Sequence, residues 1–194
     1  MSKSRASNPK TTPSKARSSS QSRPLWPWIV AAAAGVVLVA ALGVFLANRG
    51  TPTSGPGEHF PTQSRDHIAV GAPHPAYNSD PPTGGWHYDK PWDPGFYEQV
   101  VADEYLVHNL EHGHVVISYD CSKLADCEGT KAQIRQLMQR FNDWKLVAVP
   151  RKNTDAAIAL TAWGWLDKLS GYDDAKMTAF INAHRDRGPE KTAE

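Results

Sequence analysis

The longest apolar stretch of the chain covers residues 25–47, which run for 23 residues without a charged side chain. At about 1.5 Å per residue, a helix of this length crosses a hydrocarbon core of about 30 Å. Trp26 and Trp28 lie at one end of the stretch, where aromatic side chains favour a membrane interface. A cleaved signal peptide is the alternative, but its apolar region is usually only ~7–15 residues long, and no A-x-A-like site follows here. The pattern therefore predicts an uncleaved transmembrane helix.

Helical and strand periods alternate in the last half of the chain. Residues 99–112 have apolar side chains at helical spacing, and Gly113 permits the backbone to end a helix there. The β-branched run 115–119 indicates a short buried strand. The elements that follow are a helix, two strands and a helix, predicted at 128–143, 145–151, 157–169 and 173–185. This order predicts an α+β fold, a single exported α/β sandwich domain with a small mixed sheet.

Between these regions the chain is rich in Pro, Gly and aromatic residues and follows neither period. Residues 48–65 indicate a polar linker. Residues 66–96 hold enough aromatic side chains to pack on a domain, so we expect ordered irregular coil or short strands. A long aperiodic segment inside a compact domain is often functional. The predicted organisation is a disordered tail, a transmembrane helix, a linker and a globular domain, at 1–24, 25–47, 48–65 and 66–190.

Charge is distributed unevenly, although the net charge is only +1. Residues 1–49 hold seven Lys and Arg and no acid, whereas the remainder carries all 20 Asp and Glu against 14 Lys and Arg. Basic residues before an apolar span stay in the cytoplasm, which predicts a single-pass protein of the cell membrane with its C-terminal domain outside the cytoplasm. The lipid bilayer is then its first partner. The acidic balance of the domain disfavours nucleic acid as a partner, and no protein or cell-wall partner is indicated.

Cys121 and Cys127 are separated by five residues. An extracytoplasmic compartment is oxidising, and a bridge there would stabilise the fold by about 2 kcal/mol. Metal binding by the thiolates is the alternative, but the spacing is not C-x2-C and there is no second pair. Two free thiols would follow if the topology were different. We expect a structural disulfide.

Four ionisable side chains lie within seven residues at the end of the first predicted helix: His108, Glu111, His112 and His114. On a helix His108 and His112 share one face, and Glu111 flanks it. This spacing suits two imidazoles that bind one metal ion. His87, in the Gly- and Pro-rich loop 81–88, is the best third ligand.

Zinc or copper is the metal expected, because imidazole and carboxylate ligands suit such ions where thiols oxidise. Glu111 would be a fourth ligand or would orient an imidazole, and it would be the catalytic group if the site were hydrolytic. His67 and His74 are reserve ligands. His59, in the linker, and His184, near the C-terminal end, are left out.

Two other interpretations of the cluster stay open. The string H-N-L-E-H at 108–112 matches the H-x-x-E-H pattern of some zinc peptidases, in which Glu acts on metal-bound water. Gly113 and a strand follow at once, which disfavours a metal-dependent hydrolase. The other interpretation is a metal-free binding or scaffolding module of the cell envelope, whose His and Glu side chains form a hydrogen-bonded network. His114 is expected only at a strand edge.

Two further features carry weaker predictions. Trp86 and Trp92, in the irregular segment, are candidates for stacking on a ligand such as a glycan, whereas the Trp residues of predicted helices and strands are assigned to packing. The tail 188–190 either brings Glu190 back against the domain or is exposed to solvent.

A family resemblance is carried by three segments, PPTGGWHY at 81–88, GFYEQVVADEYLVHNLEHGHVVISYD at 95–120 and HRDRGPE at 184–190. They resemble the family called domain of unknown function 3105, over roughly residues 59–190. Its members are commonly bacterial and often carry an N-terminal membrane anchor. The chain departs from the family pattern at Gly84, where the family has Ser, and at His114, where it has a small residue. The resemblance implies no activity, but it implies that four side chains match motif positions: His87, His108, Glu111 and His112.

Overall fold

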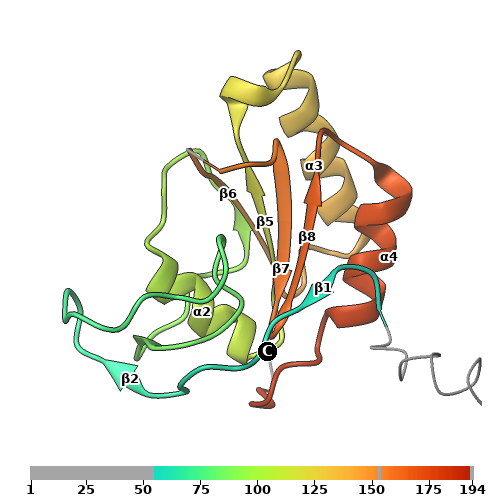
Figure 1. The fold of residues 1–194 in the computed structure, drawn as a ribbon. Helices are drawn as coiled ribbons and strands as arrows, with labels where there is room; N and C mark the ends of the chain where they lie inside the picture. Colours follow the sequence, from blue (N-terminus) through green and yellow to red (C-terminus); the bar gives the residue numbers. More distant parts are fainter. Residues whose placement is uncertain (1–54, 153, 193–194) are drawn as a thin grey trace, which may run out of the picture. The chain divides into compact units, whose positions relative to one another are not determined.

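A mixed sheet of six strands organises the residues that the computed structural model describes, 55–152 and 154–192 (Figure 1). The strand order is β1-β8-β7-β5-β6-β4, in which β4 and β5 pair with β6 in parallel and the other pairs are antiparallel. The predicted α+β class is therefore confirmed. The strands are β1 (Glu58–His59), β4 (Gly95–Phe96), β5 (Val115–Tyr119), β6 (Leu146–Pro150), β7 (Ile158–Ala162) and β8 (Trp165–Leu169).

Helices cover both faces of this sheet, α2 (Asp103–Glu111) on one face and α3 (Cys127–Arg140) with α4 (Asp174–His184) on the other (Figure 1). Ile117 of β5 packs toward α3 and α4, whereas its neighbour Val116 packs toward α2. Because successive side chains of a strand point to opposite faces, a strand covered on both sides is apolar throughout. Every residue of β5 is accordingly buried.

The helix ends follow from local hydrogen bonds. The Asp126 carboxylate accepts from the backbone N–H of Gly129 at 2.8 Å and so caps the start of α3. Helix α2 ends where Gly113 adopts a φ of 82°, as the sequence predicts. The predicted disulfide is present, and it joins the 3-10 turn Cys121–Lys123 to the first residue of α3, Cys127.

The prediction of one strand over 157–169 is wrong, because this stretch is a hairpin of β7 and β8. The chain reverses at Trp163 and Gly164, and Gly164 has a φ of 75°. This turn has a positive φ at its second position only, a conformation that glycine adopts at no steric cost. Strand β7 is buried on both faces, so its sequence lacks the alternation of polar and apolar residues that would have distinguished it from β8 as a second strand.

The irregular segment is ordered by short strands, as its composition indicates. Strand β2 (His67–Ile68) pairs in parallel with β3 (His87–Tyr88) and forms a separate two-stranded sheet. The Tyr77 hydroxyl donates to the carbonyl oxygen of Trp86 at 2.8 Å, which holds the intervening chain against this small sheet. The segment therefore presents two histidines, His67 and His87, side by side.

The predicted disordered tail and the predicted transmembrane helix over residues 25–47 lie outside the described residues, and so does the start of the predicted linker, residues 48–54. Within the described ranges, none of the helices combines the length and the apolar character that crossing a bilayer requires.

His184 makes the stability of the domain sensitive to pH. It is buried at the end of α4, its ring stacks on Trp165 with centroids 4.6 Å apart, and its Nε2–H donates to the Pro56 carbonyl at 2.8 Å. Burial lowers the pKa of His184, and the bond to Pro56 offsets this only in part. The unfolded chain therefore takes up this proton first, near pH ~6.5. The contribution of His184 to the free energy of unfolding is therefore fully present above that pH. It is lost as the pH drops toward the lower pKa that His184 has in the folded state.

We expect His184→Gln to flatten the loss of stability between pH 7.5 and pH 5.5, because glutamine does not titrate. Urea unfolding of both proteins at the two pH values measures the difference, in which contributions from other histidines cancel. The same pH dependence in both proteins would contradict the assignment to His184.

Candidate metal centre

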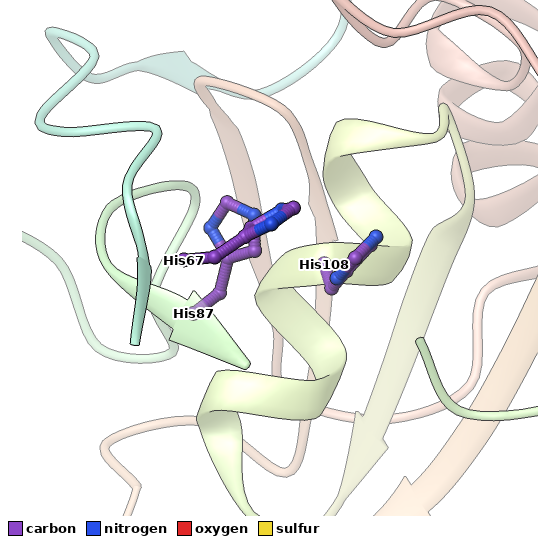
Figure 2. A group of neighbouring side chains, drawn as sticks. All are labelled: His67, His87 and His108. Atoms are coloured by element: carbon purple, nitrogen blue, oxygen red, sulfur yellow. The ribbon is translucent and has the colours of Figure 1, made fainter. Parts of the chain in front are cut away.

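Three histidines converge between the small sheet and helix α2, namely His67 of β2, His87 of β3 and His108 of α2 (Figure 2). One ring nitrogen of each lies within 4.8 Å of those of the other two. The parallel register places His67 directly opposite His87, with ring centroids 4.8 Å apart. The ring of His108 lies 5.0 Å from each of the other rings and is nearly parallel to that of His67. The three side chains thus come from three segments that are far apart in sequence.

Oxygen atoms fix the orientation of all three rings. Nδ1 of His87 donates to the carbonyl oxygen of Gly85 at 2.7 Å, and Nδ1 of His108 donates to that of Tyr88 at 2.6 Å. Nδ1 of His67 lies 3.3 Å from a carboxylate oxygen of Asp89. A carbonyl oxygen can only accept, so Nδ1 of His87 and of His108 carries the proton. Nε2 is then the atom that His87 and His108 have available as a ligand, the arrangement usual for metal-binding histidines.

Glu111 lies beside the three rings. Its Oε2 is 2.9 Å from Nε2 of His87 and 3.8 Å from Nε2 of His67, and its Oε1 accepts from Nε of Arg65 at 2.6 Å. Burial by itself would raise the pKa of Glu111, but the hydrogen bond from Arg65 and the charge of His87 outweigh it, so the pKa lies below its ordinary value. The carboxylate is therefore ionised at neutral pH.

The contact of Oε2 of Glu111 with Nε2 of His87 needs a positive charge or a proton between these two atoms. Nδ1 of His87 already holds one proton. In the neutral ring Nε2 therefore carries a lone pair, which faces the lone pairs of the Glu111 carboxylate. Either a second proton on His87 or a metal ion removes this repulsion. Nε2 of His108 lies 3.0 Å from Nε2 of His112, and here a neutral His112 that carries its proton on Nε2 can donate the hydrogen bond without a metal ion.

The separations of Glu111 from two of the rings bracket that of neighbouring ligands in a coordination sphere. Metal–nitrogen bonds of ~2.0–2.1 Å place two ligands of a tetrahedral ion roughly 3.4 Å apart. Oε2 of Glu111 lies 2.9 Å from Nε2 of His87 and 3.8 Å from Nε2 of His67, and the nitrogens of the three histidines lie within 4.8 Å of one another. Burial lowers the pKa of His108, and its hydrogen bond to Tyr88 offsets this only in part, so its ring is kept neutral, the form that binds metals. The donor set of imidazole and carboxylate suits zinc or copper.

The structure brings together His87, His108, Glu111 and His112, the four ligands that the sequence predicts, and adds His67. The sequence ranks His67 only as a reserve, because no local spacing relates it to the helix. The position of His67 depends on the pairing of two very short strands, in which it lies opposite a residue 20 positions later in the chain. His112 contacts His108 but does not belong to the group of three nitrogens that lie mutually within 4.8 Å.

The remaining histidines lie elsewhere. His74, the second reserve ligand, faces Glu104 at 3.2 Å and the ring of Tyr77. His59 packs against Trp165, outside the cluster. His114 directly precedes β5, at the edge of the strand as predicted, and there its side chain is fully buried and its Nδ1 donates to the carbonyl of Asn109 at 3.0 Å.

The aromatic residues of the irregular segment pack inside the domain. Trp92 is partly buried and contacts Tyr97 and Tyr105, with ring centroids 5.9 and 5.3 Å away. Trp86, also partly buried, lies with its ring centroid 6.1 Å from that of His74. These contacts give each ring a packing role, and stacking on a ligand stays a prediction.

Sequence reasoning assigns Trp163 to the core and misses its contact with the site. Its ring is 6.4 Å from that of His87, and a Cβ atom at Gly84 would meet it in ordinary contact at 3.6 Å. The backbone N–H of Gly164 donates to the carbonyl of Thr83 at 2.8 Å. The β7–β8 turn therefore holds the loop whose Gly85 carbonyl orients His87.

Comparison with known proteins identifies one family. The family described as Protein of unknown function (DUF3105) matches residues 72–194. The matched range contains His87, His108, Glu111 and His112, and it begins after His67. No curated protein and no solved structure matches the chain.

Proposed function

The chain belongs to the DUF3105 family of proteins of unknown function, and from its site we propose that the folded domain binds a divalent transition metal ion, zinc or copper. The ligands would be Nε2 of His67, His87 and His108. The observation that carries the proposal is the orientation of the rings, in which oxygen atoms lie at Nδ1 and one ring nitrogen of each histidine lies within 4.8 Å of those of the other two. Protein scaffolds fix imidazoles in this way for metal binding.

Glu111 is the proposed fourth ligand, through Oε2. Its other oxygen is held by Arg65, which fixes the carboxylate plane and leaves Oε2 toward His87 and His67. A carboxylate with a lowered pKa is a weak base, and both of its oxygens already have partners. These contacts favour Glu111 as a ligand or an orienting group over a general base, so we propose no hydrolytic reaction.

A metal-free envelope module is the competing proposal, supported by the direct contacts of His87 with Glu111 and of His108 with His112. Protons in place of a metal would make these contacts an internal hydrogen-bonded network. The two proposals differ in whether a metal ion changes stability.

We also propose that residues 25–47 anchor the chain in a membrane and that the domain lies outside the cytoplasm. The apolar stretch and the basic residues that precede it support this topology. The disulfide between Cys121 and Cys127 supports an oxidising compartment.

Metal removal tests the proposed function. We expect the full-length protein to bind about one zinc or copper ion, and free metal at 100 times its Kd to stabilise the domain by about 2.7 kcal/mol. For a domain of this size that raises the Tm by roughly 5–10 °C, which EDTA should reverse. Thermal melts with zinc, with copper, with EDTA, and with magnesium as a control that prefers all-oxygen sites measure the effect. Absence of bound metal, together with a Tm that metal does not change, would favour the metal-free network.

A further inference from the structure

The C-terminal segment folds back onto the end of α2, and residues 186–190 are called the strap below. The backbone N–H of Asp186 donates to the carbonyl of Gly113 at 2.7 Å, and that of Glu190 donates to the carbonyl of Glu111 at 3.1 Å. A side chain at Gly188 would collide with the carbonyl oxygen of Glu111. The strap therefore lies in contact with the helix end, and its register along that end is set by two backbone hydrogen bonds.

A buried lysine ties the strap to the same helix end. Nζ of Lys145 donates to the carbonyl of His112 at 3.0 Å, to a carboxylate oxygen of Asp186 at 2.9 Å and to the hydroxyl of Thr192 at 3.4 Å. Its side chain is only 1% exposed, so this cation is compensated by these oxygens and not by bulk water. One side chain thus links the end of α2 to the first residue of the strap and to Thr192, just beyond the strap.

The strap carries a carboxylate to the metal centre. Oε1 of Glu190 lies 3.8 Å from Nε2 of His112, the same atom that lies 3.0 Å from Nε2 of His108. The Glu190 side chain is about half exposed, at 48%. Glu190 therefore lies at the rim of the cluster, on the side of His112.

Charge balance gives this carboxylate a role. Three neutral imidazoles leave the charge of a divalent ion uncompensated, and the charge of Glu111 is already balanced by Arg65. Asp89 faces Nδ1 of His67, the side of the ring turned away from the cluster, and is 82% exposed. Glu190 is a further carboxylate beside the cluster, 3.8 Å from Nε2 of His112, and a partly buried dication favours such a neighbour strongly.

We propose that Glu190 is a metal ligand of this centre, that it binds beside His112, and that the strap closes the site over the ion. This inference rests on the proposed metal binding and extends it to a second segment of the chain. It implies that the ion holds the strap in place and that its removal loosens the strap.

The test is the zinc affinity of the full-length protein, measured by competition with a chromogenic chelator. We expect Glu190→Gln to weaken zinc binding about 10-fold or more, the size of effect that supporting groups of metal sites have. Glu190→Asp should recover part of the affinity, because it keeps the charge on a shorter side chain. Glu58→Gln, which removes the same charge from an exposed position on β1, should leave the affinity unchanged.

The position of the strap is tested separately. Gly188→Ala should weaken zinc binding by a similar factor, because the added methyl group displaces the strap from Glu111. Gly171→Ala is the matched control, since a Cβ atom there would meet nothing within 4 Å. Zinc should also slow tryptic cleavage after Arg187, an exposed residue of the strap, and Glu190→Gln should abolish this protection.

The outcomes separate the two proposals. If the unmodified protein binds no zinc, the proposed function fails, and the role of Glu190 fails with it. If that protein binds zinc and Glu190→Gln binds it equally well, only the role of Glu190 is overturned. Weaker binding by Glu190→Gln, with normal binding by Glu58→Gln and loss of the tryptic protection, would establish it.

Discussion

Alanine at His87 or at His108 is expected to lower the zinc affinity of this protein by at least about 100-fold. Each substitution removes one of the three converging nitrogens. Groups that only orient a ligand already contribute 10–100-fold to affinity, so the loss of a ligand itself should reach or exceed the upper value. The measurement is zinc competition with a chelator, together with the loss of zinc-induced stabilisation in thermal melts.

His67 and His112 distinguish two versions of the ligand set. The geometric cluster contains His67, whereas the helical spacing in the sequence favours His112. We expect His67→Ala to match the effect of His87→Ala and His112→Ala to have a smaller effect, because His112 lies outside the group of three nitrogens. His59→Ala, which removes an imidazole packed on Trp165, is the control. Normal zinc binding by both His87→Ala and His108→Ala would show that the ion, if bound, lies elsewhere.

Elements held by local interactions could be predicted from the sequence to within a few residues. The strand predicted at 115–119 has those bounds in the structure, because a short β-branched run next to a glycine is buried on both faces. Helix α4 has the bounds Asp174–His184 against a prediction of 173–185. Helix α2 starts four residues later than predicted, since residues 99–102 are not helical and Ala102, directly before the helix, has an extended backbone.

Features that depend on distant contacts could not be predicted in this way. The β7–β8 hairpin has a single local signal, Gly164, within an otherwise apolar stretch. The contact of His67 with His87 rests on two-residue strands, which have no measurable period. Glu190 reaches His112 because a lysine 41 residues away from Asp186, Lys145, fastens the strap. The proximity of His108 and Glu111 could be predicted, because it depends only on the geometry of one helical turn.

Leu110→Ala is expected to lower both the stability of the domain and its affinity for metal. Leu110 is 1% exposed and packs with Val116 and Val147 between α2 and the sheet. Truncating a buried leucine costs about 2–5 kcal/mol, a large part of the ~5–15 kcal/mol that such a domain has. Because Leu110 lies between His108 and Glu111 on the helix, its loss should also let both side chains shift. Metal sites tolerate displacements of only ~0.5 Å, so we expect zinc affinity to fall roughly 10-fold.

Leu160→Ala separates the two effects, because Leu160 is equally buried but lies in the cluster on the other face of the sheet, among residues of α3 and α4. We expect a similar loss of stability in urea with EDTA present, and an unchanged zinc affinity in the absence of urea, where both variants are folded. Equal losses of affinity in the two variants would mean that zinc binding reports only the overall stability of the fold. A loss confined to Leu110→Ala would show that the packing of α2 on β5 and β6 sets the geometry of the metal centre.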